Sequence, residues 1–175
     1  GPRKNELGAS AYYNLFGELG ANIPKPDFKM VKHEIKFLLD LIDAELVQSC
    51  HDISDGGLGV TVAEMMMTSR ERGMYGAKIN LTHTGFKDKK KKKTTALRID
   101  QKLFSETGGF VVEIRAKDRK KAKKLAILSG VPLIQFGRVT RSKKLDVSDE
   151  GKEIFSLPLS KMRTAWENGL REKLK

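Results

Sequence analysis

The stretch from Ser49 to Val60 constrains the fold of this 175-residue chain more than any other. A short apolar run, 46–50, leads into it, and an amphipathic run, 57–72, follows it. Between the two runs the sequence is His-Asp-Ile-Ser-Asp-Gly, and the second run begins with a further glycine, Gly57. This order predicts a buried strand, in which Cys50 packs as a small hydrophobic residue, then a tight turn and the first turn of a helix. A turn followed by a helix N-terminus is an arrangement that can hold an anion.

The predicted turn contains several groups that can bind a phosphate or a metal ion. The N–H groups of Gly56 and Gly57 are not shielded by side chains, and they precede a helix whose first N–H groups lack intrahelical partners. Ser54 offers a hydroxyl, and Asp55 offers a carboxylate that can cap the helix or bind a sugar hydroxyl. Asp52, at the end of the strand, can hold Mg²⁺ that bridges phosphates. The same pattern is common in turns that bind nothing, so these residues alone leave both interpretations open.

Composition excludes several classes of protein. Hydrophobic residues make up 39% of the chain and charged residues 32%, which is typical of a soluble globular protein. No apolar run approaches the roughly 20 residues of a membrane span. The single cysteine excludes an intrachain disulfide framework and favours a reducing compartment. No signal-peptide pattern follows the initial Gly-Pro-Arg-Lys, and the absence of an initiator Met suggests a fragment, so we expect a cytoplasmic location and part of a longer chain.

The formal net charge of +12 raises the question of nucleic-acid binding. The basic residues are spread over 89–93, 117–124 and 138–144, with no zinc-ligand spacing and no aromatic residues between them for base stacking. This pattern favours a solvated lysine-rich surface over a nucleic-acid interface. The segment 82–95, which contains the five consecutive lysines 89–93, is expected to be a mobile surface loop.

Elements with helical spacing alternate with short apolar runs along the chain, which predicts one layered α/β or α+β domain over 1–175 with a mixed β-sheet and flanking helices. Trp166 is expected to anchor the last helix in the core. Helices are predicted at 6–16, 27–43, 57–72, 99–106 and 117–129 and from 158 onward, and strands at 46–50, 76–81, 109–114, 132–139, 145–147 and 154–157.

Four motifs, in order, resemble one known family. They are Asn-Glu-Leu-Gly-Ala-Ser-Ala-Tyr-Tyr at 5–13, His-Asp-Ile-Ser-Asp-Gly-Gly-Leu at 51–58 followed by Ala-Glu-Met at 63–65, Leu-Phe-Ser-Glu-Thr at 103–107, and Phe-Val-Val at 110–112. Together with Trp166 in a closing helix, they are similar to the second half of the phosphoribosylformylglycinamidine synthases, the formylglycinamide ribonucleotide amidotransferases of purine biosynthesis. The resemblance covers nearly the whole chain.

The resemblance implies a fold and a reaction. The fold is the C-terminal-type domain of the aminoimidazole ribonucleotide synthetase superfamily. In the reaction, ATP and glutamine-derived ammonia convert formylglycinamide ribonucleotide to formylglycinamidine ribonucleotide, with ATP/ADP and Mg²⁺ as cofactors. By resemblance, Asp52 binds magnesium and Ser54 contacts a nucleotide phosphate. Residues Gly8, Ala9, Ser10, Asp55, Gly56, Gly57 and Glu106 line the same cleft, which holds either the substrate or an auxiliary nucleotide.

The chain departs from the family pattern at three places. Ala9 replaces a second glycine, Gly108-Gly109 stands where the family has a polar residue and an arginine, and the lysine run 89–93 is not a family feature. The family's catalytic histidine and glycine-rich ATP loop have no counterpart, so we expect no catalytic residue in this chain and no activity from it alone.

The implied partners are the remaining domains of the synthetase, a glutaminase subunit or domain and a phosphorylated ribonucleotide substrate, without a membrane. A homodimer is a further option for the isolated chain. The alternatives are a free-standing, non-catalytic binding or assembly module of the same superfamily, or a basic nucleic-acid-binding domain.

Overall fold

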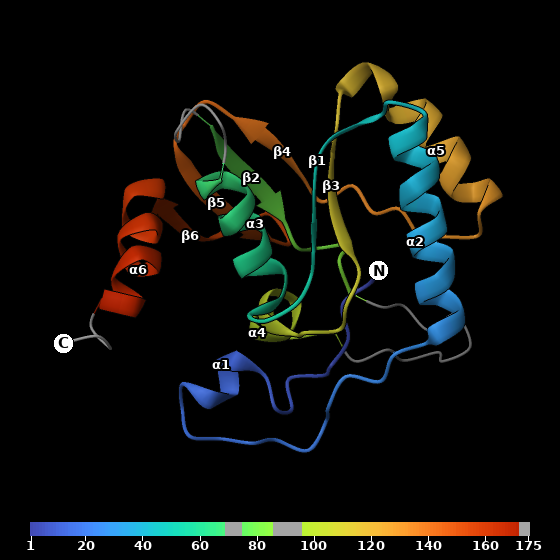
Figure 1. Ribbon diagram of the computed structural model, residues 1–175. Helices are drawn as coiled ribbons and strands as arrows, with labels where there is room; N and C mark the ends of the chain where they lie inside the picture. The colour runs from blue at the N-terminus through green and yellow to red at the C-terminus, as the bar shows by residue number, and fades with distance from the viewer. Residues whose placement is uncertain (69–74, 86–95, 172–175) are drawn as a thin grey trace. The chain divides into compact units, whose positions relative to one another are not determined.

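The computed structural model describes residues 1–68, 75–85 and 96–171 (Figure 1). The chain divides into two compact units, one made of Gly1–Thr61 with Thr84–Gln135 and the other of Val62–His83 with Phe136–Lys175. The lysine run 89–93 lies outside the described residues, and so does most of the predicted loop 82–95. The single domain over 1–175 stays a prediction.

The first unit pairs two strands and packs helices beside them (Figure 1). Its two strands are antiparallel, with Asp52 opposite Phe110. The Asp27 side chain accepts from the backbone N–H of Lys29 and of Met30, so it caps the N-terminus of the helix predicted over 27–43. The elements are α1 (Ala11–Asn14), α2 (Phe28–Asp43), β1 (Val47–Asp52), the start of α3 (Gly57–Met67), α4 (Ile99–Phe104), β3 (Phe110–Ile114), the 3₁₀ helix η1 (Ala116–Asp118) and α5 (Arg119–Leu128).

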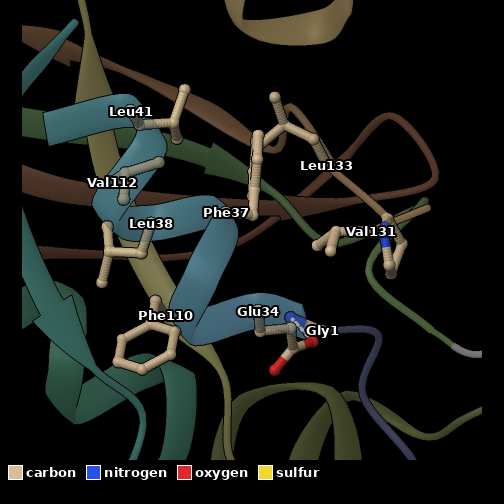
Figure 2. A pocket seen from close by; sticks show the side chains of 10 residues that line it. Gly1, Glu34, Phe37, Leu38, Leu41, Phe110, Val112, Val131 and Leu133 are labelled. Carbon is tan, nitrogen blue, oxygen red and sulfur yellow. Dashed lines mark ion pairs between the residues drawn. The ribbon is translucent and has the colours of Figure 1, made fainter. Parts of the chain in front are cut away.

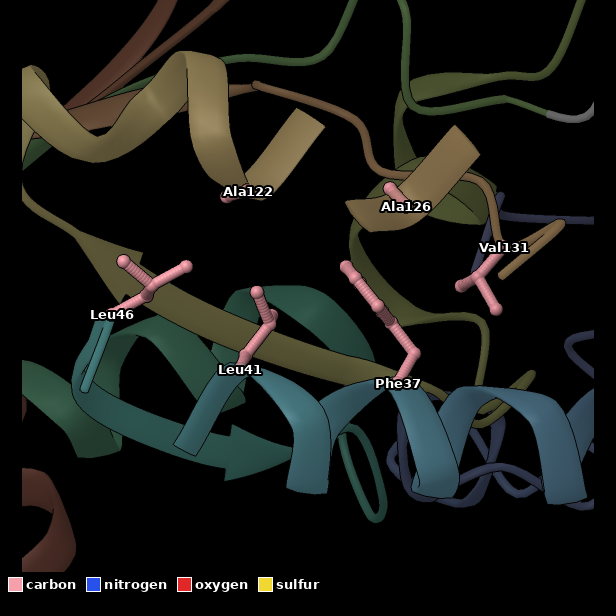
Figure 3. Close-up of a cluster of buried hydrophobic side chains, with 6 residues drawn as sticks. All are labelled: Phe37, Leu41, Leu46, Ala122, Ala126 and Val131. Carbon is pink, nitrogen blue, oxygen red and sulfur yellow. The ribbon is translucent and has the colours of Figure 1, made fainter. Parts of the chain in front are cut away.

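One hydrophobic cluster of the first unit lies between α2 and α5. Phe37 and Leu41 of α2 point toward Ala122 and Ala126 of α5 (Figure 3). Two alanines one helical turn apart leave room for the larger side chains of the facing helix. Leu46 and Val131 complete the cluster.

The second unit is built on a mixed four-stranded sheet. The strand order is β4-β2-β5-β6, with β2 parallel to β5 and the other neighbouring pairs antiparallel. This mixed sheet with flanking helices confirms the predicted fold class. Its elements are the end of α3, β2 (Gly76–Asn80), β4 (Gly137–Thr140), β5 (Lys144–Asp149), β6 (Lys152–Pro158) and α6 (Leu159–Arg171). No helix among the described residues is both long and apolar enough to cross a lipid bilayer.

Several predicted elements are wrong in extent. The helix expected over 6–16 is reduced to α1, because Ser10 caps it and the residues before Ser10 form a turn. The strand expected over 132–139 begins only at Gly137.

Two predicted burials are also wrong. Trp166 is 63% exposed on α6 and does not anchor the core. Cys50 is exposed, because alternate residues of β1 face solvent.

Candidate functional site

Glu106 joins two turns that lie far apart in the sequence. Its Oε1 atom accepts a hydrogen bond from the backbone N–H of Gly56 at 2.8 Å and from that of Ala11 at 2.9 Å. Glu106 is separated from these residues by 50 and 95 positions in the chain. The structure therefore brings three of the motifs together on one carboxylate oxygen.

The turn before α3 requires both of its glycines. Gly56 and Gly57 have φ angles of +77° and +65°, in the left-handed region that glycine adopts without strain. A Cβ atom on Gly57 would lie 2.8 Å from the backbone oxygens of Leu103 and Ser105. The glycine pair thus lets α3 begin directly against the backbone that leads to Glu106. The side chains of Ser54, Asp55 and Asp52 are exposed around this turn.

The turn before α1 is closed by hydrogen bonds within its own loops. The N–H of Gly8 donates to the Asn22 carbonyl at 2.8 Å, and the N–H of Ala9 donates to the Leu19 carbonyl at 2.7 Å. Ala9 has a φ of +57°, so it adopts the backbone conformation for which glycine is the usual residue.

The side chain of Ser10 also forms its hydrogen bonds within this first turn. Its side chain is buried, donates to the Leu7 carbonyl at 2.7 Å and accepts from the N–H of Tyr13 at 3.2 Å. The backbone N–H of Ser10 also donates to the Leu7 carbonyl. The next N–H, that of Ala11, is the one that reaches Glu106. No observation tests the expectation that Gly8, Ala9 and Ser10 line a phosphate site. Because the N–H groups of Gly8 and Ala9 and the Ser10 hydroxyl already bond within this turn, we assign the phosphate to the second turn, before α3.

An aromatic contact supports the joined turns. The rings of Tyr12 and Phe104 are stacked, with centroids 4.6 Å apart and an interplanar angle of 5°. Tyr12 follows Ala11, and Phe104 lies two residues before Glu106. The stack therefore ties α1 to α4 beside the hydrogen bond between Ala11 and Glu106.

Arg3 is a site residue that no sequence pattern indicated. Its side chain is buried at 1% exposure and donates to the carbonyls of Ser105 at 3.3 Å and Thr107 at 3.4 Å, and also to that of Gly108. Burial lowers the pKa of Arg3 to about 10, against the opposing effect of the nearby carboxylates Glu34 and Glu6. The guanidinium is therefore still protonated at neutral pH, and it holds the backbone on both sides of Glu106.

Gly109 makes room for the backbone of Gly1, next to Arg3. Its φ is +109°, and a Cβ atom there would lie 2.7 Å from the backbone nitrogen of Gly1 and 3.4 Å from Arg3 Nη2. The Gly108-Gly109 pair, which departs from the family pattern, is thus accommodated together with the buried arginine.

Asp52 lies at the end of β1 with its side chain 62% exposed. Its Oδ1 atom is 3.3 Å from Nδ1 of His51. Although the Cys50 residue as a whole is exposed, partial desolvation of its thiol, and then the charge of Asp52, raise the pKa of that thiol, which is two residues earlier and on the same face of the strand. Among the described residues no group of three His, Cys, Asp or Glu side chains gathers in a metal-binding arrangement. Asp52 fits Mg²⁺ only as a single protein ligand, with phosphate and water supplying the other oxygens.

A small pocket lies elsewhere in the first unit. It is bounded by α2, β3 and the segment after α5, and its lining is apolar except at Glu34 and Gly1 (Figure 2). Its volume is about 40 Å³, which is room for only a few water molecules. None of the predicted site residues lines it, so the candidate site is the exposed turn region around Gly56 and Glu106 and not this pocket.

The chain belongs to a known family of domains. It matches the family described as AIR synthase related protein, C-terminal domain, over residues 3–150. Phosphoribosylformylglycinamidine synthase subunit PurL of Methanothrix thermoacetophila is 34% identical over all of this chain and 21% of the relative. The corresponding subunit of Thermoanaerobacter pseudethanolicus is 31% identical over 98% of this chain and 21% of the relative. This chain therefore spans about a fifth of the length of the curated relatives it matches.

Solved structures agree on the fold. The chain is similar to the T. maritima PurL complexed with FGAR, with a TM-score of 0.73, 17% identity, and coverage of 93% of this chain and 26% of that one. It is also similar to the T. maritima PurL complexed with ATP, with a TM-score of 0.66 and 15% identity. At these identities the likeness shows the fold alone.

Proposed function

We propose that this chain is a domain of an ATP-dependent carbon–nitrogen ligase of purine biosynthesis. The ligase converts formylglycinamide ribonucleotide, ATP and glutamine-derived ammonia to formylglycinamidine ribonucleotide. The observation that carries the proposal is that three motifs shared with that family meet at the carboxylate of Glu106. Relatives named as that synthase match 98–100% of the length of this chain, which supports the proposal.

The contribution of this domain is one wall of a phosphate site. In this proposal the phosphate contacts the exposed hydroxyl of Ser54 and the N–H groups at the start of α3, apart from that of Gly57, which donates to the Ser54 carbonyl at 3.0 Å. The helix dipole adds about 0.3–1 kcal/mol to the binding. Asp55 lies in the same exposed turn and is placed to bind a sugar hydroxyl. The phosphate belongs to ATP, to ADP or to the phosphorylated ribonucleotide, for which T. maritima PurL complexes with ATP, ADP and FGAR are precedents.

Asp52 is the residue that would hold magnesium at this wall. A bound Mg²⁺ would neutralise phosphate charge. The single exposed carboxylate of Asp52 fits an ion whose other ligands are phosphate and water. No catalytic residue is assigned to this chain. The reacting groups belong to the remaining domains of the synthetase, the ammonia comes from a glutaminase partner, and the enzyme is cytoplasmic.

An exposed apolar stripe supports the presence of further domains. The face of α2 opposite the core carries large hydrophobic side chains at helical spacing, all of them at least 38% exposed. Stripes of this kind mark surfaces that are covered in an assembly. We infer that the remaining synthetase domains cover this apolar face of α2. In the isolated chain, a second copy can cover the same face in a homodimer. The residues are Phe28, Val31, Ile35, Leu39 and Ile42.

A titration of the ¹⁵N-labelled chain with magnesium–ADP tests the phosphate wall. We expect the amide signals of Ser54, Gly56 and Gly57 to shift, while that of Gly151, another glycine with positive φ, stays in place. Adenosine without phosphates is the matched control ligand and should leave the three signals unmoved. Shifts confined to residues outside the turn would contradict the proposal.

An activity assay tests whether the reacting groups lie outside this chain. The purified 175-residue chain should give no formylglycinamidine ribonucleotide from formylglycinamide ribonucleotide, ATP and ammonia. Turnover above the rate without protein would show that the reacting groups are in this chain after all.

A further inference from the structure

The Glu106 carboxylate already sits where two backbone N–H groups converge. We propose that in the ligand-free chain this carboxylate stands in for a ligand phosphate, and that phosphate binding displaces it. The inference rests on the proposed function, and it assigns Glu106 a role different from direct contact with the ligand. Glu106 is then a residue that sets the affinity and the charge preference of the site.

The geometry of the hydrogen bonds gives the first argument. The N–H groups of Gly56 and Ala11 both donate to the same atom, Oε1, at 2.8 and 2.9 Å. Each N–H has one hydrogen, so a phosphate oxygen can bind either group only after Glu106 has released it. Backbone N–H groups from separate turns that converge on one point form a concave site for an anion, and a carboxylate and a phosphate both satisfy it.

The charges give the second argument. If Glu106 stayed in place, a phosphate at the same turn would lie within a few ångströms of a like charge, in a region where water screens only partly. Release of the side chain into solvent removes this repulsion. The competition therefore favours exchange of one anion for the other over occupation by both.

The surrounding contacts leave the side chain free to make this exchange. Arg3 holds the carbonyls of Ser105, Thr107 and Gly108, so the backbone on either side of Glu106 is fixed. The Glu106 side chain is only partly buried and has three rotatable bonds. A rotamer change is enough, and the two turns keep their positions through the Tyr12–Phe104 stack and their own backbone hydrogen bonds.

The test compares the affinity of the wild-type chain and Glu106→Gln for magnesium–ADP. Glutamine keeps an oxygen that accepts from both N–H groups, but it lacks the charge that makes the contact strong and repels phosphate. We expect the dissociation constant, measured from the Gly56 amide shift, to fall by about tenfold in this variant. Glu113→Gln removes a carboxylate of the same unit that bonds to Ser49, and it should leave the dissociation constant unchanged.

The outcomes separate this inference from the proposed function. Tighter binding by Glu106→Gln, or binding by that variant alone, supports the exchange. If the wild-type chain binds magnesium–ADP and Glu106→Gln binds it equally or more weakly, the inference is wrong and Glu106 contacts the ligand directly. The proposed phosphate site at the second turn is not contradicted by that result. If neither protein binds magnesium–ADP and both give well-dispersed amide spectra, the inference and the phosphate wall fall together. Glu106→Ala serves as a second variant and should also bind more tightly than wild type.

Discussion

Two turns of the first unit contain glycine and precede a helix, but their hydrogen bonds differ. In the turn before α1, the N–H groups of Gly8 and Ala9 donate to backbone carbonyls of the 19–22 segment. In the turn before α3, the N–H of Gly57 also donates to a backbone carbonyl, that of Ser54 at 3.0 Å, but the N–H of Gly56 donates to the side chain of Glu106. A backbone carbonyl is a fixed part of the loop, whereas a side-chain carboxylate can rotate away. The first turn is therefore a structural closure, and the second is a site that can be opened to a ligand.

The largest expected effect is from Gly57→Ala. The added Cβ would meet backbone atoms of residues 103–105 at 2.8 Å, and alanine would be held at a φ of +65°. We expect a loss of about 3 kcal/mol or more in the free energy of unfolding, measured by urea denaturation, because strain and overpacking add. Gly17→Ala is the matched control, since Gly17 has a similar φ of +69° and open space around it. An equal loss in both variants would show that the close packing beneath the second turn contributes nothing.

Ser10→Ala should destabilise the chain without changing ligand binding. The buried hydroxyl makes two hydrogen bonds that close the first turn, so its removal should lower the free energy of unfolding by about 1–2 kcal/mol, measured by urea denaturation. If Ser10→Ala is fully folded and still binds magnesium–ADP more weakly than wild type, the first turn also contributes to ligand binding and the proposed difference between the turns is wrong.

Ser54→Ala should weaken magnesium–ADP binding and leave stability nearly unchanged. Because Ser54 is exposed, we expect the free energy of unfolding to change by no more than about 0.5 kcal/mol.

Ala9→Gly should stabilise the first turn slightly. Ala9 has a φ of +57°, and glycine removes the steric cost of that conformation at the expense of a more flexible unfolded chain. We expect a net gain of about 0.5–1 kcal/mol in the free energy of unfolding. A loss on substitution would mean that the alanine methyl makes a stabilising contact that outweighs its backbone strain.

The reactivity of Cys50 gives a pH-dependent test at Asp52. Partial desolvation and the Asp52 charge raise the pKa of the thiol, so less thiolate is present at a given pH and alkylation by iodoacetamide is slowed. In Asp52→Asn the charge contribution disappears, and the midpoint of the rate–pH curve should move to lower pH. Asp43→Asn, which removes a carboxylate at the end of α2, is the control and should not move it.

Magnesium bound at Asp52 should shift the same midpoint in the same direction. Added magnesium–ADP therefore reports on the metal through the only cysteine of the chain. A midpoint that is lowered by Asp52→Asn and unaffected by magnesium–ADP would place the metal away from Asp52.

The sequence predicted the local parts of the site and missed its long-range contacts. The strand, glycine turn and helix around Gly56 were predictable because apolar period and glycine position act within a few residues. The role of Arg3 was not, because it holds the backbone at Ser105, 102 residues away in the chain. Periodicity shows which residues share a helix face but not what covers that face, and this is why the burial predicted for Trp166 is wrong.

The most direct test of the difference between the turns is a comparison of amide signals in one titration of the wild-type chain with magnesium–ADP. We expect the signals of Gly56 and Ala11, whose N–H groups donate to Glu106, to shift together as the ligand replaces the carboxylate. We expect the signals of Gly8 and Ala9, whose N–H groups donate to backbone carbonyls, to stay in place. Shifts at Gly8 and Ala9 with none at Gly56 would contradict the account.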